Sequence, residues 1–208
     1  MLAIRRGELA RAEALIAWNA DVNTANKNDT TALIIACGCG HVEVARALLA
    51  AGAGVHAANK DGWTALSAAS ENGDVEVVRA LLAAETGVDA AAVHGRRALL
   101  CASKFGHIEV VRALLAAGAH VDSANSRGST ALLLASGEGH VEVVRALIAA
   151  GAHVDAANHV GETALLIAGM REHAEVVRVL IVHSAAVLTP FTLMIIYINK
   201  SSSSRAKA

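Results

Sequence analysis

Aromatic side chains are scarce in this chain. Only 2% of its 208 residues are aromatic although 54% are hydrophobic, and the apolar share is mostly alanine, valine and leucine. A core of small side chains gains little burial per residue, so its elements must approach closely. There is a single proline, Pro190, against 17 glycines. This balance favours many short helices with glycine at their ends over a proline-punctuated sheet.

An excess of charge of either sign is also missing. The formal net charge is −1 and both signs are interspersed, which argues against a polyanion-binding surface and predicts no nucleic-acid partner. The three cysteines, Cys37, Cys39 and Cys101, lack a second ligand pair at zinc spacing. We expect free thiols in a reducing compartment, the cytoplasm. The N-terminal residues lack the apolar stretch of a signal peptide.

Internal repetition dominates the sequence. The tripeptide Thr-Ala-Leu recurs with a step of 33 residues and no insertion, and Arg97-Ala98-Leu99 takes the one missing place. Its starts are Thr31, Thr64, Thr130 and Thr163. Glu-Val-x-Arg keeps the same step at Glu43, Glu76, Glu109, Glu142 and Glu175, as do Gly-His and Ala-Gly-Ala. Such a period predicts a stack of identical small modules.

One repeat shows the local structure that its markers predict. Thr64 is a good N-cap for a short first helix, and Gly73 ends that helix in a left-handed conformation. A second helix follows, with Val78, Leu81 and Leu82 as its apolar stripe and an ion pair between Glu76 and Arg79 on its wet side. Neither helix is long enough to persist alone, so each repeat must bury its apolar face against its neighbours.

These markers resemble the ankyrin repeat over roughly residues 1 to 188. The resemblance implies two antiparallel helices and a projecting β-hairpin in each repeat. Alanine replaces the family's proline throughout, and its histidine position holds Ile34, Ser67, Leu100, Leu133 and Leu166. Losing that histidine should remove hydrogen bonds at the helix start. The third full repeat departs most, with Arg97 for the capping threonine, and the stretch that leads into it has Ala92 for the usual asparagine and Glu85 for glycine.

Metal binding and catalysis find little support. His41, His107, His140 and His173 recur at one repeat position, and equivalent residues of packed neighbours lie roughly 8–10 Å apart. Zinc ligands must converge to about 2 Å from the ion, so we expect these histidines to be structural or solvated. No nucleophile, phosphate-binding or dinucleotide motif is present in the sequence. We predict a non-enzymatic chain without cofactor or metal.

Positions that vary between repeats are the candidates for recognition. They are the hairpin residues and the ends of the first helices, which the resemblance places on one concave surface. The candidate partner-binding residues are Lys27, Thr30, Lys60, Asp61, Trp63, Glu71, Asn72, His94, Arg96, Lys104, Phe105, Arg127, Ser129, Glu138, His159, Glu162, Met170 and Arg171.

Two aromatic residues stand out among these positions. Trp63 is expected at a hairpin tip and Phe105 at a first-helix end, and an exposed aromatic is a common interface anchor. Trp63 could equally pack flat on its neighbouring hairpin. Arg96, Arg97, Lys104 and Arg127 form a basic centre around them, which would suit a partner with acidic groups beside an apolar anchor, unless it is a solvated charged face.

The C-terminal segment allows three interpretations. Residues 179–198 carry no Lys, Arg, Asp or Glu, and their length approaches the ~20 residues of a membrane span. Because residues 179–182 already belong to a second helix, residues 185–198 are better explained as an irregular cap over the last repeat. A membrane anchor and a disordered tail are the alternatives. The serine-rich end from Ser201 is expected to be disordered.

We therefore predict an all-α ankyrin-type repeat solenoid with short β-hairpin loops. The repeat domain is expected at 1–188, with a partial repeat at 1–28 and full repeats near 29–61, 62–94, 95–127, 128–160 and 161–188. An apolar segment and polar tail occupy 189–208. The predicted function is a monomeric, cytoplasmic scaffold that binds another protein. The alternatives are a tail-anchored membrane adaptor and a fragment of a larger ankyrin-containing protein.

Overall fold

The computed structural model describes residues 1–84 and 98–184. Within these residues the regular structure is helical, apart from isolated antiparallel bridges at the base of each hairpin. The chain divides into two compact units. Unit 1 consists of Met1–Ala102 and Glu109–His120, and unit 2 of Ser103–Ile108 and the described residues from Val121 onward. The all-α repeat prediction is confirmed.

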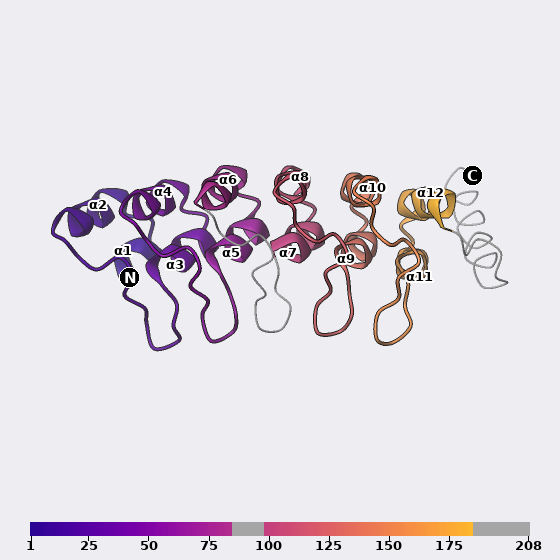
Figure 1. The fold of residues 1–208 in the computed structure, drawn as a ribbon, viewed down its shortest axis with the longest axis horizontal. Coiled ribbons are helices and arrows are strands. Elements are labelled where there is room, and N and C mark those ends of the chain that lie inside the picture. The colour runs from indigo at the N-terminus through magenta and orange to yellow at the C-terminus, as the bar shows by residue number, and fades with distance from the viewer. Residues whose placement is uncertain (85–97, 185–208) are drawn as a thin grey trace, which may run out of the picture. The chain divides into compact units, whose positions relative to one another are not determined.

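Unit 1 begins with the helices α1 (Leu2–Arg5), α2 (Leu9–Ala17), α3 (Ala32–Gly38), α4 (Val42–Ala50), α5 (Ala65–Asn72) and α6 (Val75–Ala83). Each first helix packs antiparallel on its second helix, and α3 packs beside α5 while α2, α4 and α6 form a second row (Figure 1). The hairpins project from the side of the first helices (Figure 1). Helices α7 (Ala98–Phe105) and α8 (Ile108–Ala116) contribute to both units.

Unit 2 repeats this arrangement with α9 (Ala131–Glu138), α10 (Val141–Ala149), α11 (Ala164–Met170) and α12 (Ala174–His183). Helix α9 packs against α11, and α10 against α12. The first helices again separate the hairpins from the second helices (Figure 1). Side chains on the hairpins and on the ends of the first helices therefore share one side of the unit.

Threonine caps begin the first helices, as predicted. The hydroxyls of Thr31, Thr130 and Thr163 each accept a hydrogen bond from the amide three residues later. In the second full repeat Thr64 and Ser67 form a reciprocal capping box, in which the Ser67 hydroxyl accepts from the Thr64 amide at 3.0 Å. Ser67 occupies the family's histidine position, so here the predicted loss of helix-start hydrogen bonds does not occur.

The core repeats with the sequence. The second helix of each full repeat buries one leucine, and Leu48, Leu81, Leu114, Leu147 and Leu180 are at most 2% exposed. The predicted apolar stripe was wrong at one position: Val77 is fully buried, whereas Leu82 is only half-buried. Val77 faces the core because a globular helix buries a stripe wider than one row of residues.

The expected ion pair between Glu76 and Arg79 is also corrected. Glu76 pairs with Arg46 of the preceding repeat, with 3.2 Å between Nη1 and Oε2. The pattern within one helix forms elsewhere, in Glu109–Arg112, Glu142–Arg145 and Glu175–Arg178. Charges on neighbouring second helices are close enough to compete with a partner on the same helix.

The recurring histidines have a structural position. Nε2 of His41, His140 and His173 donates to the carbonyl oxygens of Arg5, Lys104 and Gly137, each 36 residues earlier. These imidazoles link successive repeats of one unit. Within the described residues, no group of three or more His, Cys, Asp or Glu side chains is placed to hold a metal ion.

The ends of the chain differ from the internal repeats. Arg11 in α2 is exposed at the position where all five full repeats carry a buried valine, and it pairs with Glu8. At the other end, residues 185–208, on which the cap, anchor and tail interpretations depend, lie outside the described residues. No helix in the described part of the chain is long and apolar enough to cross a membrane.

Candidate protein-interaction surface

An asparagine side chain builds each described hairpin. In unit 2, Oδ1 of Asn125 accepts hydrogen bonds from the amides of Arg127 (2.9 Å) and Ser129 (3.0 Å). Asn26, Asn59 and Asn158 make the equivalent pairs of bonds in their own hairpins. An Asx turn of this kind fixes the backbone. The side chains at the tip can therefore vary without changing the loop.

Neighbouring hairpins within a unit are joined by backbone hydrogen bonds. The Lys60 amide donates to the carbonyl of Asn28 (3.1 Å), and the His159 amide donates to that of Arg127 (3.0 Å). The Lys60 ammonium also donates to the Lys27 carbonyl at 2.7 Å. Both lysines are exposed, and part of the hydrogen-bonding capacity of Lys60 is used inside the protein.

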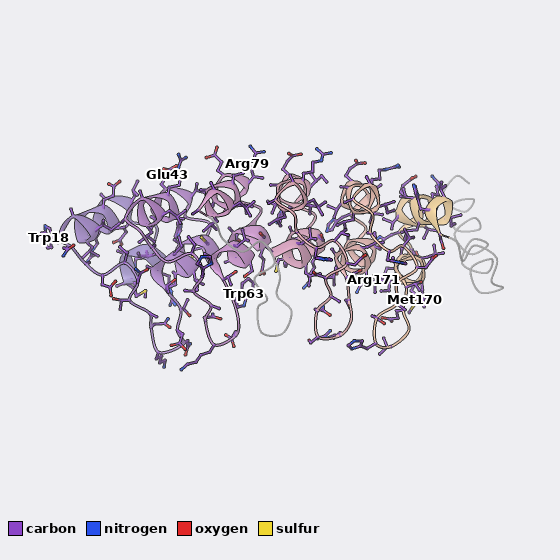
Figure 2. The ribbon with its side chains drawn as sticks, viewed as in Figure 1. Trp18, Glu43, Trp63, Arg79, Met170 and Arg171 are labelled. Atoms are coloured by element: carbon purple, nitrogen blue, oxygen red, sulfur yellow. The ribbon has the colours of Figure 1, made fainter. Side chains whose placement is uncertain are left out.

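Trp63 does not project from its hairpin as an exposed anchor. It is half-buried and lines a cavity of about 300 Å³ with Ile34, Gly38, Glu71 and Asn72, among others. Figure 2 shows it between the hairpin and the first helices. The Asn72 amide group donates to the carbonyl of Cys37 at 2.6 Å. The structure thus favours the packing interpretation of Trp63.

The remaining candidates of unit 1 lie on the same side. Thr30 is half-buried, and its amide donates to Asn26 Oδ1. Asp61 is exposed at the tip of the next hairpin.

Phe105 and Lys104 lie at the end of α7. Phe105 is 44% exposed. Its ring stacks on His107 at 6.4 Å between centroids, and Nζ of Lys104 lies 5.2 Å from the ring centre. Phe105 thus offers an exposed aromatic surface with a cation beside it.

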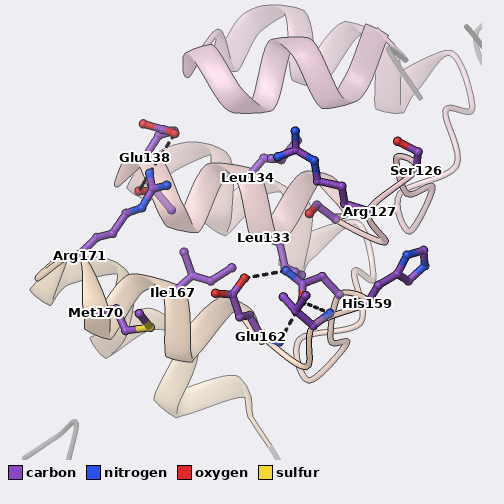
Figure 3. Close-up of a pocket in the computed structure, with 14 residues that line it drawn as sticks. Ser126, Arg127, Leu133, Leu134, Glu138, His159, Glu162, Ile167, Met170 and Arg171 are labelled. Carbon is purple, nitrogen blue, oxygen red and sulfur yellow. Dashed lines mark hydrogen bonds and ion pairs between the residues drawn. The ribbon is translucent and has the colours of Figure 1, made fainter. Parts of the chain in front are cut away.

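Unit 2 contains an open groove of about 640 Å³ between two neighbouring repeats. We refer to it as the 126–171 groove (Figure 3). Seven of the predicted residues line it, namely Arg127, Ser129, Glu138, His159, Glu162, Met170 and Arg171. In the sequence these residues belong to two kinds of segment, the hairpins and the ends of the first helices. In the folded chain both kinds line the same groove.

The groove has an apolar floor and charged walls. Leu133 is buried, Leu134 and Ile167 are half-buried, and Met170 is 68% exposed. Nη1 of Arg171 lies 3.0 Å from a Glu138 carboxylate oxygen and donates to the carbonyl of Gly137 at 2.8 Å. These contacts hold one wall of the groove in place (Figure 3).

Some features escaped the sequence prediction. The floor residues Leu134 and Ile167 were not identified, because apolar side chains on a first helix are normally assigned to the core. Trp18 was also missed and is 83% exposed at the end of α2. It stands in register with Ala51, Ala84, Ala117, Ala150 and His183, so a tryptophan at a position that is alanine in four of the five full repeats was a usable signal. The candidates His94 and Arg96 lie outside the described residues, as do Val93 and Arg97.

Comparisons with known proteins agree on the fold. The family model described as ankyrin repeats (3 copies) matches in four overlapping stretches, at residues 1–93, 52–125, 81–158 and 99–190. The chain is similar to the crystal structure of the human ASB11 ankyrin repeat domain, with 31% sequence identity and a TM-score of 0.83. That match covers 90% of this chain and 84% of the other. No curated protein sequence matches the chain.

Proposed function

Since the chain belongs to the ankyrin repeat family, whose repeats are in general protein–protein interaction modules, we propose that it binds a partner protein through its hairpins and first-helix ends. The fold is typically a non-catalytic scaffold, and we propose that role here. The observation that carries the proposal is the 126–171 groove, which is lined by seven of the residues that the sequence offers as candidates.

The physical support comes from exposed apolar surface at that groove. Val160 is 78% and Met170 is 68% exposed, and both line it. Phe105, in the same unit, adds an aromatic surface that is 44% exposed. Large apolar side chains beside charged ones are the usual composition of an interface that excludes water when a partner binds.

The test uses the tagged full chain as bait in a cell extract, followed by mass spectrometry. Phe105→Ala and Met170→Ala should together abolish the capture of at least one protein that the unchanged chain retains. Val182→Ala is the matched control, because Val182 is 80% exposed on α12 and does not line the groove. Trp63→Ala would be a poor test, since it removes one wall of a cavity.

Circular dichroism and the melting temperature of each variant show whether folding is preserved. Equal capture by the Phe105→Ala, Met170→Ala chain and by the Val182→Ala chain, with both folded, would refute the proposed surface.

A further inference from the structure

The charged side chains that line the 126–171 groove differ in the partners they have within the protein. Arg171 is held by Glu138 and by the Gly137 carbonyl. The Glu162 carboxylate accepts a hydrogen bond at 2.8 Å from the side-chain amide of Asn158. Arg127 is exposed, and within the described residues no carboxylate pairs with its guanidinium. Glu162 keeps its negative charge, since its partner is a neutral amide. Among the described arginines that line the groove, Arg127 is therefore the one whose guanidinium has no carboxylate partner and can pair with a ligand.

The apolar part of the groove complements this cation. Leu134 comes from α9, while Ile167 and Met170 come from the facing helix α11 (Figure 3). Methionine is flexible and polarisable, so it adapts to the shape of an incoming apolar side chain. An apolar ligand group bound here would cover surface that is exposed in the free chain.

We propose that the 126–171 groove binds a short segment of the partner in which an acidic residue and a bulky aliphatic one lie close together in the sequence. The acidic side chain pairs with the guanidinium of Arg127, whose planar fork matches a carboxylate. The aliphatic side chain packs on Leu134, Ile167 and Met170. This inference rests on the proposed function and specifies the chemistry of the partner.

A library of short synthetic peptides tests the pairing directly. One position is fixed as Asp, Asn, Ala or Lys and a nearby one as Leu or Ala, and binding to the full chain is measured by fluorescence anisotropy. Peptides with Asp and Leu should bind best. Replacing Asp by Asn should weaken binding about tenfold, because the amide lacks the charge that pairs with the guanidinium.

Reversing the charge of Arg127 tests whether this side chain sets the preference for an acidic residue. In the Arg127→Glu chain the affinity for Asp peptides should fall at least about tenfold. Peptides with Lys at that position should then bind best. Arg145→Glu is the matched control, because Arg145 is an exposed arginine of α10 that pairs with Glu142 outside the groove. It should leave the ranking unchanged.

An unchanged preference for Asp in the Arg127→Glu chain would overturn the inference, as would a library without any charge preference. Those results remain distinct from a failure of the proposed function. A chain that still captures a cell protein through Phe105 and Met170 keeps its role as a binding module, even when the peptide rule is wrong.

Discussion

The imidazole of His140 lies over Gly106 so closely that a Cβ added to Gly106 would be 2.6 Å from Nδ1. Gly106 is left-handed, with φ of 77°, and the same imidazole donates to the Lys104 carbonyl at 3.0 Å. The pairs Gly7–His41 and Gly139–His173 repeat the approach at 2.8 and 2.7 Å. The Gly-His marker thus describes two residues of successive repeats that pack against each other.

Gly106→Ala should lower the free energy of unfolding by about 2–3 kcal/mol. Part of this is the left-handed backbone, roughly 1–2 kcal/mol, and part is displacement of the His140 ring with loss of its hydrogen bond, about 1 kcal/mol. Gly151→Ala is the matched control, because φ there is 87° but nothing lies within 4 Å of its added Cβ. Urea denaturation gives both values.

A His140→Ala background completes this test. There the cost of Gly106→Ala should fall to that of Gly151→Ala, because the clashing ring is gone. If Gly106→Ala and Gly151→Ala lower the free energy of unfolding equally in the chain that keeps His140, the contact between Gly106 and His140 does not contribute to stability.

Glu172 should be replaceable by glycine with a gain in stability. It has φ of 61° at the position where Gly40, Gly73, Gly106 and Gly139 have φ of 69–78°. Glu172→Gly relieves roughly 1–2 kcal/mol of backbone strain. Part of this gain is offset because glycine gives the unfolded chain more conformational entropy. We expect a net gain of about 0.5–1 kcal/mol in urea denaturation.

The contrasting substitution is Glu175→Gly, in the first turn of α12. It should destabilise by up to about 1 kcal/mol, the helix-propensity cost of glycine. A loss of stability in both chains would show that the left-handed position of Glu172 is not strained.

Ser136→Ala should stabilise the chain by about 1 kcal/mol or more. Ser136 is fully buried in α9, and its hydroxyl has no hydrogen-bond partner among the described residues. A buried unsatisfied hydroxyl costs about 1–3 kcal/mol, and alanine also favours the helix. Thermal unfolding followed by circular dichroism measures the effect.

Ser67→Ala is the opposite case, because the Ser67 hydroxyl is bonded to both the amide and the carbonyl of Thr64. It should destabilise by about 1 kcal/mol. Stability changes of the same sign at the two serines would contradict this account.

Cys37 should resist alkylation in the folded chain. Burial and, to a smaller degree, the charge of Asp74 raise the pKa of its thiol from 9.0 to about 12. The thiolate is the reactive form, so at pH 9 iodoacetamide should label Cys37 only after denaturation, whereas the exposed Cys39 reacts in the native chain. Both cysteines lie on one tryptic peptide, so fragmentation of that peptide by tandem mass spectrometry assigns the label to one or the other.

The same shift has a defined sign in stability. The pKa of the Cys37 thiol is higher in the folded chain than in the unfolded chain. The buried thiol therefore contributes its full share to the free energy of unfolding below about pH 9, and this share declines as the pH rises toward 12. Native Cys37 that reacts as fast as denatured Cys37 at pH 9 would refute its burial.

The repeated part of the fold was predictable because each marker has a local cause. Threonine caps, left-handed glycines and the buried leucine of each second helix follow from residue type and spacing alone. Prediction failed where the outcome depends on a neighbouring repeat. Glu76 pairs with Arg46 rather than Arg79. For Trp63 the sequence left two alternatives open, an exposed anchor and a packed side chain, and the structure places it at a cavity.

The site was only partly predictable for the same reason. Variation between repeats selected seven residues that line the groove, but it did not show that Glu138 and Arg171 pair with each other while Arg127 has no carboxylate partner among the described residues. Glu138 and Arg171 occupy the same position of successive repeats. A position-by-position comparison of neighbouring repeats finds these opposite charges at equivalent positions, and it would have predicted the ion pair.

The most direct test of partner binding is site-specific photo-crosslinking of the full chain in cell extract. A benzophenone amino acid is placed at Met170 in the groove or at Val182 outside it, both exposed apolar positions. We predict a discrete adduct with another protein from position 170 and none from position 182. The same adduct from position 182, with no adduct from 170, would contradict recognition through the hairpin and first-helix side.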